Sequence, residues 1–388
     1  MQHICSSLLA TTLALSLSAC QPIQPVVKVD ATTQPAGAAP AMAKHPTVAT
    51  GLNGPQGVLV DPDGNVWVID SGVGGDQAIP FLAPGIGPVT ATYGESARVV
   101  KITPDGTQTD IAMLPSVAAG QEFIGGARLA LLDGNLYATS GQWVTEAGAD
   151  RLPNMGAVVQ IADGAVTEVA NTWEIENAEN RGGFVVDTHP YGLAAGSDGM
   201  LWVADAGGNE LLKVDPASGA VEVIAVFDGL PGPLPNPFRG DAQEMDPVPT
   251  GVTQDADGNA YVSLLSGFPF VPGAAKVLKV AVDGTVSDYA TGLTALTDLR
   301  TAPDGQMYAV QFAIFGDQGP TPDSGAVIRI KEGDTSEVLV AGLAFPTSLD
   351  FNANGDAYVT LNGVGAPGSG AVIVLRGLTE MVGQPVTQ

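Results

Sequence analysis

The chain has 388 residues, of which 50 are glycine and 29 are proline, and only 14% are charged. Because no long stretch has the pattern of an amphipathic helix, this composition predicts an all-β protein of many short strands joined by turns. The 41 acidic and 15 basic residues give a formal charge of -26, and a surface of this charge excludes general nucleic-acid binding. It either favours cations such as calcium or simply keeps the protein soluble.

The first twenty residues have the pattern of an export signal. Residues 4–19 are apolar or small, but their Ser and Thr content is too high for a membrane-spanning helix. Leu17-Ser18-Ala19-Cys20 resembles the lipobox of bacterial lipoproteins, so we expect residues 1–19 to be cleaved and Cys20 to carry the lipid. Ordinary secretion after cleavage and a retained anchor are the alternatives.

Residues 20–44 are rich in Pro, Ala and Thr and lack apolar periodicity, so we expect a flexible tether. Gln21 stands where Asp would favour retention in the inner membrane of Gram-negative bacteria, and it therefore permits export to the outer membrane or periplasm. No cysteine follows Cys20, which excludes disulfides and Cys-based zinc sites from the rest of the chain. A multi-histidine metal site is excluded too, because the only histidines are His3, His45 and His189.

A repeated pattern runs from residue 51 onward. In each of six copies a glycine follows Asp or Asn and precedes an aromatic residue by three positions. Asp-Gly tolerates the left-handed backbone of a tight hairpin turn, and the alternating apolar residues on both sides are strand faces. The six glycines are Gly64, Gly134, Gly199, Gly258, Gly305 and Gly355.

Each copy is followed by a second hairpin, so each predicts a sheet of four strands. Six such sheets predict a six-bladed β-propeller over residues 45–379, followed by a tail of residues 380–388. The last copy lacks an outer strand, because only one strand, Gly370–Arg376, follows its first hairpin. Residues 45–52 resemble the outer strands of earlier copies, so we expect them to pair with Gly370–Arg376, complete the last blade and close the ring.

A small or short residue stands seven positions before each repeat glycine. This is what the convergence of backbones on a central axis requires. The residues at this position are Gly57, Ala127, Gly192, Gly251, Asp298 and Ser348.

The connections between hairpins are longer than the turns within them, and all of them fall at the same end of the sheets. They include residues 71–97, 113–123 and 228–248. Insertions concentrated on one face indicate the binding face, which we call the long-loop face. Where this face meets the central channel we expect six candidate ligand-binding residues, namely Asp70, His189, Tyr191, Asp205, Asp298 and Gln311.

The acidic residues in this set have two interpretations. They bind a cation or a polar ligand together with His189, or they cap turns by accepting hydrogen bonds from backbone amides. The Asp-Gly turns lack the bidentate Glu of a calcium loop, and no Gly-x-Ser-x-Gly elbow accompanies a suitable His. The sequence therefore identifies no catalytic residue and no metal ligand.

Three stretches resemble the ScyD/ScyE family of exported propeller proteins, named after genes of the cyanobacterial scytonemin cluster. They are residues 51–77, 190–215 and 248–280, and the Gly-Phe-Pro-Phe of the last is the most specific. The resemblance spans residues 45–376 and implies a propeller fold and export, with no catalytic residues to carry over. A second similarity is to calcium-dependent lactonases and lyases of six-bladed type, but the Glu of their metal site has no match here.

The sequence thus favours an exported, lipid-anchored propeller that binds a protein or small-molecule ligand through its long-loop face. We expect a monomer with no resident cofactor and no nucleic-acid partner, attached to a bacterial membrane only through its lipid, or secreted if it is not lipidated. The alternative is a metal-dependent hydrolase, lactonase or lyase, with calcium held by acidic residues at the channel mouth.

Overall fold

The computed structural model describes residues 45–386 except 84–86, 121, 145–149 and 182–185. The predicted signal segment and tether lie outside the described residues. Within the described part the protein is almost entirely β-structure, with one α-helix, α1 (Thr172–Glu179), and the short 3-10 helices η2 (Pro237–Arg239) and η3 (Leu378–Glu380). None of the helices found there has the length and hydropathy that crossing a membrane requires.

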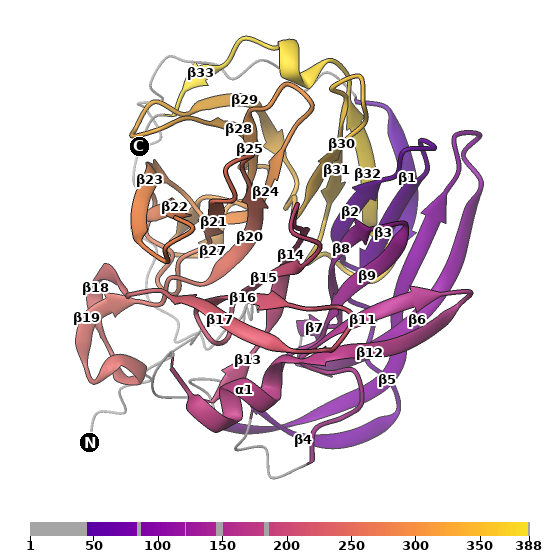
Figure 1. The fold of residues 1–388 in the computed structure, drawn as a ribbon, viewed down its shortest axis with the longest axis vertical. Coiled ribbons are helices and arrows are strands. Elements are labelled where there is room, and N and C mark those ends of the chain that lie inside the picture. The colour runs from indigo at the N-terminus through magenta and orange to yellow at the C-terminus, as the bar shows by residue number, and fades with distance from the viewer. Residues whose placement is uncertain (1–44, 84–86, 121, 145–149, 182–185, 387–388) are drawn as a thin grey trace, which may run out of the picture.

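Six sheets of four or more strands follow one another along the described chain (Figure 1). The first contains β2 (Pro55–Val60), β3 (Val66–Asp70), β5 (Gly87–Ile102), β6 (Gln108–Ala119) and β7 (Glu122–Ile124), with β4 (Gln77–Ala83) paired to β5. The second contains β8 (Gly126–Leu132), β9 (Asn135–Ser140), β11 (Ala157–Ala162) and β12 (Ala165–Asn171). The third contains β14 (Pro190–Ala195), β15 (Leu201–Asp205), β16 (Glu210–Val214) and β17 (Val221–Val226).

The other three sheets repeat this order. The fourth contains β20 (Pro249–Gln254), β21 (Ala260–Leu264), β22 (Ala275–Val280) and β23 (Val286–Leu293). The fifth contains β24 (Leu296–Thr301), β25 (Met307–Gln311), β28 (Gly325–Ile330), β29 (Glu337–Leu343) and β33 (Gln384–Pro385). The sixth contains β30 (Leu349–Phe351), β31 (Ala357–Leu361), β32 (Gly370–Leu375) and β1 (Thr47–Leu52).

Three small sheets of two strands each are formed by residues of the connections. They are β10 (Trp143–Val144) with β13 (Asp187–Thr188), β18 (Leu230–Asn236) with β19 (Ala242–Met245), and β26 (Phe315–Gly316) with β27 (Gly319–Pro320).

The repeat glycines occupy hairpin turns, as the sequence predicts. Gly64 has a φ of 80°, a left-handed value that glycine adopts without strain. The carboxylate of Asp61 holds the same turn by accepting hydrogen bonds from the Asn65 amide at 2.8 Å and from the Trp67 indole at 2.9 Å. The recurring spacing of acid, glycine and aromatic residue along the chain is therefore the spacing of one hairpin.

The first strand of each sheet contacts the first strands of two other sheets, in the order β2, β8, β14, β20, β24, β30 and back to β2. In Figure 1 these strands lie near the middle of the molecule, while outer strands such as β6, β12, β23 and β29 lie toward its periphery. The backbones come very close there. A Cβ on Gly192 would lie 2.9 Å from the carbonyl oxygen of Thr250 on the next first strand. Only a residue without a side chain fits at such a place.

The hydrophobic core is divided into layers that lie between successive sheets. One cluster joins the first and second sheets through Val99 and Val159, and others join each later pair in turn. A further cluster joins the sixth sheet to the first, because Leu52 and Val372 pack with Val58. Each sheet thus buries both faces against its two neighbours.

The N-terminal strand pairs with the last sheet. β1 runs antiparallel to β32, from Thr47 opposite Ile373 to Leu52 opposite Gly370, with two irregularities in register. This is the pairing predicted for residues 45–52.

Two segments differ from the prediction. Residues 71–97 and 113–123, expected as loops, contain β4, the first half of β5, the end of β6 and β7. Their Val, Thr and Tyr content favours strands, and pairing satisfies a backbone that would otherwise need water. The expected tail also contributes a strand, since Gln384 and Pro385 of β33 pair with Val338 and Glu337 of β29.

Removal of β1 is expected to destabilise the protein. A chain that starts at residue 53 leaves the edge of β32 unpaired and uncovers Val58 and Val372, whereas a chain that starts at residue 45 keeps both. We predict that the shorter chain melts at a lower temperature and aggregates, as measured by circular dichroism and light scattering. Equal melting temperatures for the two chains would contradict the role assigned to β1.

Candidate functional site

The second sheet has an arginine where the repeat predicts a small residue. Its first hairpin turns through only two residues, Asp133 and Gly134. Leu129 therefore pairs with Ala138, which corresponds to the pairing of Val58 with Val68 in the first sheet. The register of the second sheet is thus displaced by one residue from the alignment on the repeat glycines. Arg128, and not Ala127, therefore occupies the innermost position of this sheet, which corrects the alignment made from sequence.

The Arg128 side chain is fully buried and joins several sheets at their inner edge. Its guanidinium donates hydrogen bonds to the carbonyl oxygens of Gln56 on β2 and Thr297 on β24, and to that of Thr347, just before β30, at 2.9 Å. It also lies over the Tyr191 ring of β14, 4.5 Å from the ring centroid. One side chain thus contacts four sheets besides its own.

Asp298 is the counter-charge of Arg128. It is 1% exposed, its Oδ1 lies 3.4 Å from Arg128 Nε and 3.6 Å from Arg300 Nε, and its Oδ2 accepts a hydrogen bond of 2.5 Å from Ser348 Oγ. Burial raises the pKa of Asp298, but the two arginines and the hydrogen bonds outweigh it and hold the pKa below its usual value. The pair is therefore charged.

Tyr191 and Gln56 complete the packing at the axis. The Tyr191 hydroxyl donates to Gln56 Oε1 at 2.7 Å, and the Gln56 amide donates to the Gly363 carbonyl at 2.6 Å. Both side chains are buried. The structure thus brings together two of the predicted site residues, Tyr191 and Asp298, with Arg128 between them.

Asp70 and Gln311 do not belong to this group. Asp70 is fully buried and accepts hydrogen bonds from the Arg98 amide and guanidinium, both at 2.8 Å, and from the Asn53 amide at 3.1 Å. The Gln311 side chain donates to the Ser324 carbonyl at 3.0 Å. The carboxylate of Asp70 thus fixes two chain segments at the end of β3.

His189 and Asp205 form part of a second group beside the channel. Asp205 accepts hydrogen bonds from the Thr188 hydroxyl at 2.5 Å, the His189 amide at 2.7 Å and the Gly207 and Gly208 amides at 3.0 Å. This is the capping role that the sequence offered as one interpretation. Burial lowers the pKa of His189 to about 4, so its imidazole is neutral at physiological pH.

Asp205 lies in a cluster of buried carboxyl groups that the sequence did not reveal. The other members come from α1, β13, β16 and the segment before β20, and none is more than 6% exposed: Glu176, Asp187, Glu210 and Asp246. Burial is the largest cause that raises the pKa of Asp187 and Asp205, and it raises that of Glu176 to about 7 and that of Glu210 to about 9.

An aromatic cluster lies on connections of the long-loop face. We call Phe270, Phe312, Phe315 and Phe345 the aromatic collar. Phe270 stacks on Phe315 with centroids 4.4 Å apart, and Phe312 stacks on Phe345 at 5.4 Å. Phe312 is buried, and the other three are half-buried and pack against a cluster that includes Tyr191. The collar therefore extends the apolar cluster that contains Tyr191.

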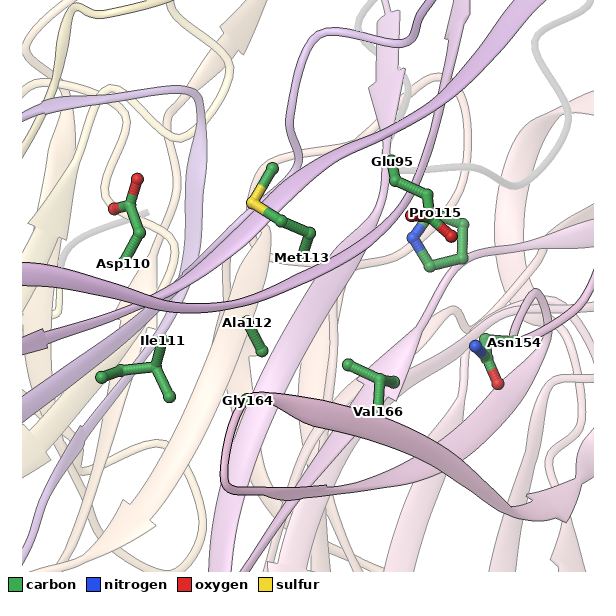
Figure 2. A pocket seen from close by; sticks show the side chains of 9 residues that line it. All are labelled: Glu95, Asp110, Ile111, Ala112, Met113, Pro115, Asn154, Gly164 and Val166. Carbon is green, nitrogen blue, oxygen red and sulfur yellow. The ribbon is translucent and has the colours of Figure 1, made fainter.

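A groove of about 390 Å³ lies elsewhere, between the outer strands β6 and β12 (Figure 2). Asp110 stands at one end of it and Glu95 and Asn154 at the other, with Met113 between them. Arg98 lies 3.6 Å from Asp110 and partly neutralises that end. None of the six predicted site residues lines this groove.

No set of three or more His, Cys, Asp or Glu side chains in the described residues is arranged to hold a metal ion. The carboxylate oxygens of Asp70, Asp205 and Asp298, which were predicted as ligand-binding residues, instead accept hydrogen bonds from groups of the protein itself or form ion pairs with them. The contacts of Arg128 hold several sheets together at their inner edge. The aromatic collar presents apolar side chains on the long-loop face.

No protein-family model and no curated protein matches this chain. Among solved structures it is similar to virginiamycin B lyase from Staphylococcus aureus, with 12% identity, a TM-score of 0.44, and coverage of 83% of this chain and 94% of the other. An oxidoreductase (glucose dehydrogenase) from Thermus thermophilus has 17% identity, a TM-score of 0.49, and coverage of 85% and 98%. A gluconolactonase from Xanthomonas campestris has 12% identity, a TM-score of 0.44, and coverage of 86% and 99%. At these values the likenesses assign no activity to this chain.

The residue that sequence reasoning missed at the axis, Arg128, does leave a signal. It stands six positions before Gly134, where the other five copies have Val or Leu. A charged residue in an aliphatic position indicates either a register shift or a buried ion pair, and the structure has both. Glu176 and Glu210 leave no such signal, because they approach one another only through the connection between the second and third sheets.

Proposed function

We propose that the protein is a six-bladed β-propeller, closed by β1, that binds a ligand or protein partner through its long-loop face. The closed ring is supported by the contacts of β30 with β2, by the pairing of β1 with β32, and by the core layer between the sixth and first sheets. The binding role rests on the geometry of the channel mouth.

The observation that carries the binding role is the aromatic collar and the apolar surface around it. Three side chains on neighbouring long loops are more than a third exposed: Val73 at 39%, Ile314 at 45% and Val364 at 36%. All three follow the second strand of their sheet and so lie on the long-loop face, and exposed apolar side chains on one face are typical of a recognition surface.

The backbone at the mouth supports the same role. Val248, Phe270 and Phe345 have φ values of 52°, 56° and 44°, which are left-handed and unfavourable for side chains of this size. Each such residue costs about 1–3 kcal/mol, and strain of this kind gathers at ligand-binding sites. We infer that the loops hold these residues in place for recognition.

Binding is favoured over catalysis because the polar residues near the axis are occupied. Arg128, Tyr191, Asp298 and Gln56 bond to one another or to backbone carbonyls and are buried. A metal-dependent hydrolase, lactonase or lyase needs ligands with free oxygens and a route for substrate to reach them. A binding module needs only a surface that contacts its ligand, and the aromatic collar with the exposed apolar side chains of the long-loop face provides one.

Export and lipid attachment at Cys20 are part of the proposal and rest on the sequence. The described strand β1 begins at Thr47, so residues 20–44 would link a lipidated Cys20 to the first strand of the folded body. The long-loop face would then act outside the cytoplasm of a bacterial cell.

Substitution at the mouth tests the binding role. We predict that Ile314→Glu weakens the binding of Nile red, a neutral apolar dye, about tenfold, because a charge replaces an apolar contact. Val282→Glu is the matched control, since Val282 is 74% exposed on the turn between β22 and β23, at the other end of the sheets. Fluorescence titration measures both. Equal dye affinity in the wild type and in Ile314→Glu would count against the mouth as binding face.

Membrane fractionation tests the anchor. Cys20→Ala removes the only thiol that lipid could modify at the lipobox, so the protein is expected to move from the membrane pellet to the soluble fraction. Cys5→Ala is the control and leaves the lipobox intact. Continued membrane association of Cys20→Ala would overturn the lipid attachment.

A further inference from the structure

The cluster of buried carboxyl groups joins the one α-helix of the described chain to three neighbouring segments. Glu176 of α1 is 2% exposed, Asp187 of β13 is 3% exposed, and Asp205 and Glu210 at the facing ends of β15 and β16 are each 1% exposed. α1 packs against β13 and β11. The contacts that seat α1 thus include groups that repel one another when ionised.

The cluster has more hydrogen-bond acceptors than donors. Gln142 donates its amide to both oxygens of Asp187 at 2.9 Å. The Gln142 amide oxygen, Glu176 Oε1 and Glu210 Oε2 are buried and accept no hydrogen bond. Gln142 is itself fully buried. A buried acceptor without a donor is costly, and a proton on a carboxyl group supplies a donor.

Among the ion pairs of the described residues, basic side chains pair with only one member of the cluster, Asp246. Arg181 pairs with Glu179 and its side chain is 46% exposed, while Arg239 pairs with Asp246 at 2.7 Å and with Glu244 at 3.8 Å. His189 adjoins Asp205 through its backbone amide, and its ring is buried and neutral. The titratable and charged groups that act on this cluster are Glu176, Glu179, Arg181, Asp187, His189, Asp205, Glu210, Arg239, Glu244 and Asp246.

We propose that protons are the ligand of this cluster and that the cluster is a pH-dependent latch, which seats α1 at acidic pH and releases it at alkaline pH. The latch is independent of the proposed binding role, because its members lie beside the channel and none belongs to the aromatic collar.

The direction of the effect follows from the carboxyl groups. Burial first, and then repulsion by Asp205, raise the pKa of Glu176 to about 7 and of Glu210 to about 9, above the ordinary value of 4.5. The state in which α1 is seated therefore holds protons that the released state loses. Its free-energy advantage over the released state falls as the pH rises from the ordinary value of 4.5 through about 7 and about 9. His189 acts in the opposite sense at lower pH, since its folded pKa of about 4 lies below 6.5. Because two carboxyl groups act against one imidazole, the stability of the seated state falls with rising pH throughout the range from about pH 6 to pH 9.

Hydrogen exchange of the α1 amides tests the latch. We predict that their protection in the wild-type protein falls at least about tenfold between about pH 6 and pH 9, after correction for the intrinsic rate. Glu210→Gln, which supplies a permanent donor without charge, is expected to lose less protection over this range than the wild type, because only Glu176 then titrates with a pKa of about 7. Glu222→Gln is the matched control, because Glu222 is an exposed residue of β17 in the same sheet, and it should behave like the wild type.

Two results would overturn the latch. One is protection of α1 that does not change with pH in the wild type, or that falls equally in Glu210→Gln. The other is restoration of wild-type protection at alkaline pH by added calcium chloride, which would make a metal ion the ligand instead of protons. If Glu210→Gln fails to fold, Glu176→Gln replaces it with the same expected result.

Discussion

The ion pair between Arg128 and Asp298 is the interaction on which the arrangement of the sheets depends. Six first strands converge so closely that four of the six inner positions hold glycine or serine, namely Gly57, Gly192, Gly251 and Ser348. The remaining two positions hold the arginine and the aspartate. Since both are buried, each charge has its counter-charge in the other, and the arginine also takes up carbonyl groups that would otherwise lack donors. The loss of Asp298 leaves Arg128 buried without a counter-charge, and the loss of Arg128 leaves Asp298 only its contact of 3.6 Å with Arg300. Each single loss is therefore more destabilising than the loss of both.

The residues at the inner edge of the sheets are buried and bonded to one another, so the remaining candidate sites lie outside this group. Arg128 and Tyr191 lie together at the inner edge of the sheets, and the aromatic collar packs against the cluster that contains Tyr191. In the proposed binding mode a ligand would meet the apolar and aromatic side chains of the long-loop face first. The carboxyl cluster beside the channel is separate in position and in chemistry, and its effect is on the seating of α1. The groove between β6 and β12 is a third surface, on the outer wall.

The hairpins of the fold could be predicted from the sequence because each is local. The spacing of Asp, Gly and aromatic residue in six copies defines each turn, and the alternation on both sides defines the strands. The pairing of β1 with β32 was also predictable, since a missing strand at one end of the repeat had a matching segment at the other. β4, the first half of β5, the end of β6 and β7 were not predicted, because they lie in connections whose length alone indicated loops.

The site was less predictable because it depends on register and on distant contacts. A turn shorter than in the other copies moved Arg128 by one position, and an alignment on the glycine alone hides that shift. Asp298 was predicted as a candidate ligand-binding residue, but its partner lies 170 residues earlier in the sequence (298 minus 128) and on another sheet. Glu176 and Glu210 were not predicted, because their burial depends on how the connection that contains α1 packs against β11 and β13.

A double-mutant cycle on the axis pair tests the account most directly. Equilibrium unfolding in urea is measured for the wild type, Arg128→Met, Asp298→Ser and the double variant. We predict that each single variant loses about 3–5 kcal/mol of unfolding free energy. The double variant is expected to lose less than the sum, with a coupling of about 2 kcal/mol. Additive losses, or single variants as stable as the wild type, would contradict the central role of the pair.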